Sequence, residues 1–210
     1  MYQIDKSVQP TSLTVYKNDP QASYDNLPTN VKGDLKESLL KEQGFVCAYC
    51  MSRIRLDKMR IEHWACQDDN KNLELDYNNL LACCCGNEGK PKHTYICDKK
   101  KENNALTYSP ANRAHSINSR IIYRHGSGKV ASNNPSFDKE LNETLNLNET
   151  RLVSNRKFAL KAIHDELAKK KGTRSKQDIQ KLYTAVLAIN GNGQRKPFFG
   201  FLADYLLKKL

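Results

Sequence analysis

Apolar residues recur at helical spacing in two long stretches of the chain. In the first, residues 31–43, Gly44 follows the last periodic position and can end a helix with a positive φ. In the second, residues 150–171, a broad apolar face includes Phe158, and Gly172 breaks the pattern. The pattern therefore predicts one helix early in the chain and a longer helix in its last third.

Shorter patterns predict further elements in the second half of the chain. Two strand-like segments, 120–123 and 129–131, flank a Gly-Ser-Gly turn and predict a hairpin. Ser175 begins a capping-box sequence, which predicts a helix that starts there and ends near residue 189. Pro197 is expected in the first turn of a last helix, 198–210.

The rest of the chain is less regular. Residues 1–30 contain three prolines and predict an irregular or extended arm. A basic, hairpin-like stretch at 53–60 and a polar, turn-rich stretch at 67–79 follow the first helix. We therefore expect an α+β protein with an N-terminal arm, a core over 31–110 and a hairpin with a mostly helical region over 111–210, all packed as one body.

The charge of the chain is uneven. The 210 residues carry 34 Lys and Arg against 23 Asp and Glu, a formal net charge of +11, and residues 151–210 alone hold 14 basic and 4 acidic residues. A basic surface attracts polyanions such as DNA or RNA. A solvated helical face and a dock for an acidic protein are the alternative interpretations of the same charge.

The compartment follows from the apolar runs and the cysteines. No apolar run approaches the ~18–20 residues of a membrane-spanning helix, and residues 1–10 lack the apolar core of a secretory signal. We therefore expect a cytoplasmic protein without a membrane contact. Thiols stay reduced there, so the seven cysteines are not expected to form disulfides. Their crowding over residues 47–97 predicts a metal site instead.

A structural zinc ion is the best interpretation of this crowding. Cys47 and Cys50 form a C-x-x-C knuckle, which can supply two thiolates to one tetrahedral Zn²⁺. A redox pair is the alternative, but no βαβ pattern surrounds the knuckle. The best candidates for the second pair are Cys84 and Cys97, with Cys83 and Cys85 as competitors for the third position.

Three short segments lie between or beside these cysteines: IEHW at 61–64, NNLL at 78–81 and CDKKK at 97–101. An acid next to a histidine, an asparagine in the following loop and an acid entering a helix resemble the HNH, or ββα-metal, nuclease motif. Their order, together with LKESLLKEQGFVCAYC and KPFFGFLADYLLKKL, is similar to PtuB-type HNH proteins. Those proteins are the nuclease partners of PtuA-type ABC ATPases in Septu and some retron anti-phage cassettes.

The residues of the motif are chemically competent for phosphodiester hydrolysis. A neutral imidazole can take a proton from water at physiological pH, so His63 is the expected general base. Glu62 and Asp98 can supply oxygen ligands to a hard divalent cation, Mg²⁺ or Mn²⁺. Glu62 and His63 are neighbours, however, and reach one phosphate only if the backbone bends there.

The resemblance implies further roles. Asn79 would hold the loop or ring of His63 by hydrogen bonding, and Lys101 would face the phosphate from the helix. The family distance from Asn79 favours Cys84 as the third zinc ligand. The family more often has His or Asn where this chain has Asp98, and His93 is a rival for that position.

These observations predict a metal-dependent HNH endonuclease, a hydrolase acting on phosphodiester bonds in anti-phage defence. Duplex DNA is the default substrate, and tRNA is the alternative that the retron cassettes suggest. The resemblance also implies a PtuA-like ATPase as partner and, in a retron, the reverse transcriptase and its msDNA. The competing hypothesis is a catalytically inert, zinc-stabilised module that binds nucleic acid or protein.

Overall fold

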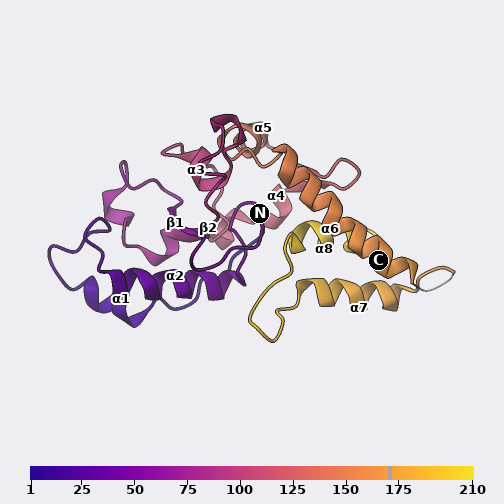
Figure 1. Cartoon of the computed structure of the whole chain (residues 1–210), viewed down its shortest axis with the longest axis horizontal. Helices are drawn as coiled ribbons and strands as arrows, with labels where there is room; N and C mark the ends of the chain where they lie inside the picture. Colours follow the sequence, from indigo (N-terminus) through magenta and orange to yellow (C-terminus); the bar gives the residue numbers. More distant parts are fainter. Residues whose placement is uncertain (170–171) are drawn as a thin grey trace.

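A computed structural model describes residues 1–169 and 172–210 and combines α-helices with two small sheets (Figure 1). The strands are β1 Arg60–His63, β2 Leu80–Cys83, β3 Ile122–Arg124 and β4 Lys129–Ala131. The α-helices of the described residues are α1 Thr11–Tyr16, α2 Thr29–Gln43, α3 Cys97–Lys101, α4 Ile117–Arg120, α5 Pro135–Lys139, α6 Thr150–Ala168, α7 Lys176–Leu187 and α8 Phe199–Leu207. The expected α+β class is therefore confirmed.

The N-terminal third contains one helix that the sequence pattern predicts and one that it misses. Helix α2 ends where expected, because Gly44 takes a left-handed conformation with φ 65°. The arm over residues 1–30 is not irregular throughout, since α1 begins directly after Pro10. Its Leu13 is fully buried, and α1 contacts α2. A single buried leucine is too little to produce a periodic signal, so α1 was not predicted.

Strands β1 and β2 form an antiparallel pair that leads to the short helix α3. Glu62 lies opposite Leu81, and His63 lies opposite Leu80. The chain leaves β2 through Gly86, where a Cβ atom would lie 2.4 Å from the backbone oxygen of Ile96. Only glycine allows the two backbones to approach this closely, so Gly86 sets the distance between the end of β2 and the start of α3.

The second half of the chain matches most of the predicted elements. Strands β3 and β4 pair as the expected hairpin. Ser175 accepts a hydrogen bond from the backbone of Asp178 and caps α7 as predicted. The position expected for Pro197 is wrong, because α8 begins only at Phe199, after a left-handed Phe198. The predicted end of the long helix near residue 171 lies outside the described residues.

Figure 1 shows α6 and α7 at the end of the molecule opposite α1. Helix α8 lies near the ends of α6 and α7 that face the middle of the molecule. Helix α8 contacts both of them. Phe158 on α6 was expected on the apolar face, but 77% of its surface is exposed. It lies outside the stripe of α6 that is buried, which comprises Leu152, Arg156, Leu160 and Ile163.

The buried apolar side chains form one connected cluster, which extends from Met1 to Leu206 and includes both sides of the β1–β2 pair. Within this cluster, helix α2 contacts β2 directly. In the ranges that the structure describes, no helix is long and apolar enough to cross a membrane.

Candidate active site and cysteine cluster

Residues from β1 and α3 line one open pocket of about 260 Å³, which we call the carboxylate pocket. Glu62 and His63 enter it from the end of β1, and Asp98 enters it from the first turn of α3. Neighbouring strand residues normally point to opposite faces. Glu62 and His63, the last two residues of β1, nevertheless both line the same pocket. The structure thus brings the three expected catalytic side chains together.

The hydrogen bonding of His63 fixes which ring nitrogen can act as a base. Its Nε2 lies 2.9 Å from the backbone oxygen of Glu74. A carbonyl oxygen can only accept, so Nε2 carries the proton and Nδ1 keeps its lone pair. No described residue hydrogen-bonds Nδ1. Burial lowers the pKa of His63 below its usual range, which leaves the ring neutral at neutral pH.

Glu62 and Asp98 place two carboxyl groups next to each other. Glu62 is only 3% exposed. Its burial, together with the nearby Asp98 carboxylate, raises the pKa of Glu62 well above its usual range, and Lys101 opposes this effect. A hard divalent cation between two such oxygen ligands would remove their repulsion. The donor set therefore fits Mg²⁺ or Mn²⁺.

Lys101 does not face a phosphate, which corrects the expected role. Its side chain is 1% exposed and lies outside the carboxylate pocket. The Nζ atom is 3.0 Å from Oε1 of Glu62 and donates to the backbone oxygen of His63 at 3.1 Å. Lys101 is the last residue of α3, where the helix turns its side chain under β1. It supports strand β1, which carries Glu62 and His63.

Asn79 ties down the loop that follows His63. Its side chain accepts a hydrogen bond from the backbone nitrogen of Ala65 at 2.8 Å. It also donates to the backbone oxygens of Ala65 at 3.0 Å and Leu73 at 3.2 Å. The backbone of Asn79 accepts from Trp64 at 3.0 Å. The resemblance implies that Asn79 holds the loop or the ring of His63, and these hydrogen bonds hold the loop.

His93 is exposed and does not line the carboxylate pocket. Its segment is held instead by Asn146, which donates to the backbone oxygen of His93 at 3.2 Å. Of the two rivals for the third motif position, only Asp98 therefore lies beside Glu62 and His63.

The four cysteines selected from the sequence form a compact cluster. The sulfur atoms of Cys47, Cys50, Cys84 and Cys97 all lie within 4.8 Å of one another. A tetrahedral zinc with Zn–S bonds of about 2.3 Å separates its sulfurs by about 3.8 Å. The distance of 3.9 Å between Cys50 and Cys84 agrees with that value. The cluster therefore fits a structural zinc ion.

The two competing cysteines lie outside this cluster. Cys83 is the last residue of β2 and is fully buried, whereas Cys85 is partly exposed. Cys84 follows the end of β2, so its side chain is free of the alternation of the strand and reaches the C-x-x-C knuckle. Spacing alone could not separate three consecutive cysteines.

Two tyrosines near the carboxylate pocket were missed by the sequence analysis. The Tyr24 ring packs edge-on against His63 with ring centroids 4.4 Å apart, and burial raises the pKa of Tyr24 to about 12. Tyr49 donates from its hydroxyl to Oε1 of Glu62 at 2.9 Å. Tyr24 comes from the arm, and no sequence signal places it here. Tyr49, however, lies inside the C-x-x-C knuckle that the analysis did single out.

No known family model matches the chain. A Vibrio cholerae serotype O1 biovar El Tor protein named "Retron Vc95 putative HNH endonuclease" is 30% identical to it over 83 residues. The match covers 38% of this chain and 39% of that protein, so it spans well under half of either. The chain is thus similar, distantly and in part, to a protein named as an HNH endonuclease. The similarity does not distinguish the PtuB type.

Proposed function

We propose that the protein is a metal-dependent HNH endonuclease that hydrolyses phosphodiester bonds of nucleic acid. One observation carries the proposal: the open pocket contains a neutral imidazole with a free Nδ1 lone pair beside the Glu62 and Asp98 carboxyls. In this proposal, β1, β2 and α3 form the ββα-metal unit. The partial similarity to a protein named as a retron HNH endonuclease supports it.

The catalytic roles follow from the geometry. Glu62 and Asp98 would hold Mg²⁺ or Mn²⁺, which neutralises charge on the scissile phosphate and on the departing oxygen. His63 accepts a proton from the attacking water at Nδ1, and the water oxygen forms a bond to phosphorus while the bond to the departing oxygen breaks. The hydrogen bond from Nε2 to Glu74 stabilises the imidazolium that results.

A second pocket lies where the basic C-terminal region begins. It measures about 280 Å³ and adjoins the cysteine cluster through Cys84. Lys58 and Arg151 line it, and neither forms an ion pair in the part of the chain that the structure describes. We propose that this pocket, which we call the Lys58–Arg151 pocket, binds backbone phosphates. Duplex DNA is the default substrate, and tRNA is the alternative.

The proposed biological role is anti-phage defence. A retron is named for the partial relative, and the sequence resemblance adds a PtuA-like ATPase. In a retron the reverse transcriptase and its msDNA would be further partners. An ATPase that gates the nuclease would leave the isolated chain with little activity, so activity assays need the neighbouring gene products.

The first prediction concerns the proposed base. His63→Ala should lower single-turnover cleavage about 10²–10⁴-fold, because the substitution removes the group that accepts the proton. The assay uses plasmid, single-stranded DNA and tRNA, with and without ATP, the copurified partners and Mg²⁺ or Mn²⁺. Circular dichroism and zinc content should match the wild type.

Two results would contradict the proposed function. One is undiminished cleavage by the His63→Ala variant, and the other is full wild-type cleavage in EDTA. Salt-sensitive binding without any metal-stimulated cleavage, even with the partners present, would favour the inert binding module instead.

A further inference from the structure

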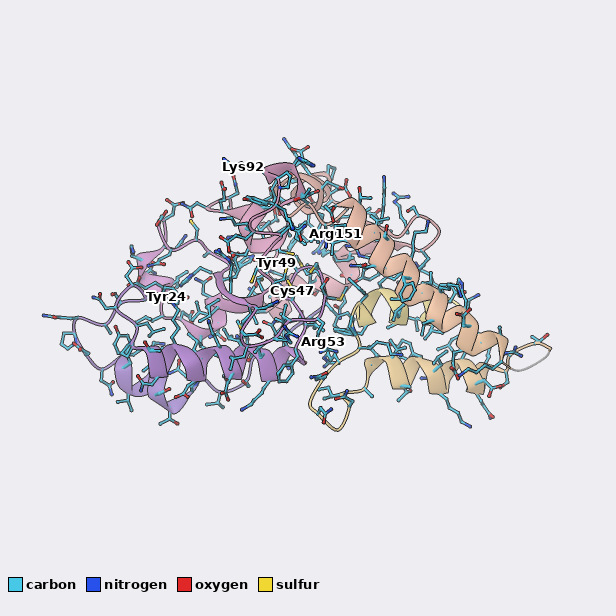
Figure 2. The ribbon with its side chains drawn as sticks, viewed as in Figure 1. Tyr24, Cys47, Tyr49, Arg53, Lys92 and Arg151 are labelled. Carbon is cyan, nitrogen blue, oxygen red and sulfur yellow. The ribbon has the colours of Figure 1, made fainter. Side chains whose placement is uncertain are left out.

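Tyr49 links the cysteine cluster directly to the carboxylate pocket. It lies between Cys47 and Cys50 in the knuckle and is fully buried. Its hydroxyl donates to Oε1 of Glu62 at 2.9 Å. Figure 2 shows Cys47 and Tyr49 next to each other in the middle of the molecule. Two residues of one tight turn thus belong to two different sites, one through sulfur and one through the phenol.

A second link runs through α3. Cys97 belongs to the cysteine cluster, and the next residue, Asp98, lines the carboxylate pocket. Lys101, at the end of the same helix, reaches the same oxygen of Glu62 that Tyr49 holds, at 3.0 Å. Displacement of Cys97 would therefore move both Asp98 and Lys101.

Tyr49 and Lys101 contact the same carboxylate oxygen of Glu62. Both contact Oε1, and within the described part of the chain no contact of either with Oε2 is seen, so Oε2 is the oxygen of Glu62 that remains for a cation. A carboxylate held in this way keeps its orientation without the cation, so less ordering is needed when the cation binds. Tyr49 has no other hydrogen-bond partner among the described residues.

We propose that Tyr49 is a positioning residue that couples the two sites, so that zinc in the cysteine cluster raises the affinity of the carboxylate pocket for a divalent cation. This inference rests on the proposed function, because it takes Glu62 as a ligand of that cation. The coupling is reciprocal by thermodynamic necessity: a cation on Glu62 must also stabilise zinc in the cluster.

Tyr49→Phe tests the coupling because it removes only the hydroxyl. The dissociation constant of Mn²⁺ is measured by electron paramagnetic resonance on the zinc-loaded full chain, and we expect it to rise about 10–100-fold. Zinc content should stay at the wild-type value. Tyr123→Phe is the matched control, since its buried hydroxyl donates to the backbone oxygen of Met1 at 2.6 Å and, among the described residues, forms no hydrogen bond with Glu62 or with a cysteine of the cluster. It should leave Mn²⁺ affinity unchanged.

The reciprocal effect gives a readout that does not depend on cleavage. Zinc loss to a chromogenic chelator is followed with and without saturating Mg²⁺. We expect Mg²⁺ to slow zinc loss from the wild type and from Tyr123→Phe, and to have less effect on Tyr49→Phe. A tyrosine that merely fills space would not change this difference.

The outcomes separate the inference from the proposed function. If Tyr49→Phe binds Mn²⁺ within twofold of the wild type, or if Mg²⁺ slows its zinc loss as much as in the wild type, Tyr49 does not couple the sites. If the wild type itself binds no Mn²⁺ and Glu62→Gln changes nothing, the proposed cation site is wrong. Should Tyr49→Phe lose zinc, Lys101→Met provides the second variant with the same expected loss of Mn²⁺ affinity.

Discussion

Two neighbouring asparagines show how one side chain can determine the shape of a loop. Asn79 is buried and makes three side-chain hydrogen bonds to the backbone of Ala65 and Leu73. Asn78 is exposed, and within the described part of the chain its side chain bonds only to Asp76. The loop fixed by Asn79 begins directly after His63, so this residue acts on the position of His63.

Asn79→Ala should therefore destabilise the fold and slow cleavage. Removing the amide leaves part-buried backbone groups of Ala65 and Leu73 without these partners, and a fully buried group of this kind would cost about 1–3 kcal/mol. We expect the free energy of unfolding in urea to fall by about 2–3 kcal/mol. Asn78→Ala is the control and should change that free energy by less than about 0.5 kcal/mol. Equal stability of the two variants would contradict the role of Asn79.

At the residue scale the sequence identified three side chains that line the carboxylate pocket, but not the contacts that hold them in place. Glu62, His63 and Asp98 were recognisable because acid, imidazole and acid occur at motif spacing. Tyr49 was not recognised, and Lys101 was expected to face a phosphate, because what both residues do depends on a fold that brings the knuckle and the end of α3 to one oxygen of Glu62.

At the scale of the elements, the β3–β4 hairpin contacts α8 through a histidine side chain that can take up a proton. His125, in the hairpin turn, places Nε2 3.1 Å from the backbone oxygen of Phe201 and 3.3 Å from the Asp204 carboxylate. Burial lowers the pKa of His125, although the Phe201 oxygen and Asp204 oppose this change, and Lys208 adds to it. The unfolded chain therefore binds this proton more tightly than the folded chain.

The free energy of unfolding should then decrease as the pH falls from about 6.5 toward the lower folded pKa of His125. Above that window the stability contribution is fully present. His125→Gln keeps a donor for Phe201 but does not titrate, so it should make the pH slope shallower in urea unfolding. Part of the slope should remain, because burial lowers the pKa of His63 as well. An unchanged slope in His125→Gln would refute the prediction.

At the element scale, prediction succeeded where the signal was local. Gly44 ended α2 and Ser175 capped α7 because both effects depend on a few adjacent residues. Helix α1 and the exposed Phe158 were mispredicted, since burial there depends on which distant element covers a face. Pro197 lies before α8 for a similar reason: Phe198 donates its backbone nitrogen to Met51 in the knuckle region at 2.9 Å.

At the scale of the whole molecule, the structure shows where the basic C-terminal region begins. The basic excess lies in residues 151–210, and Arg151 at the start of α6 lies beside the knuckle segment rather than far from it. The basic region therefore begins at the Lys58–Arg151 pocket, beside Cys84 of the cysteine cluster.

Lys58→Ala and Arg151→Ala should each weaken the binding of nucleic acids, whatever their nucleotide sequence. Each lost phosphate contact should reduce the slope of log K against log salt by about 1. Fluorescence anisotropy in the His63→Ala background prevents cleavage during the measurement. Lys17→Ala and Arg124→Ala are the controls, because both side chains are exposed and lie outside this pocket. If the four variants bind alike, phosphates do not occupy the Lys58–Arg151 pocket.

Because Cys97 and Asp98 are adjacent in the sequence, the chain cannot accept an inserted residue between them without separating the two sites. A residue inserted between them would turn the carboxylate through about 100° around the axis of α3, because a helix advances 3.6 residues per turn. Asp98 would then leave Glu62 while Cys97 stayed with the other sulfurs. The dipeptide therefore behaves as an indivisible unit, and its spacing should tolerate no insertion even where the surrounding loops lengthen.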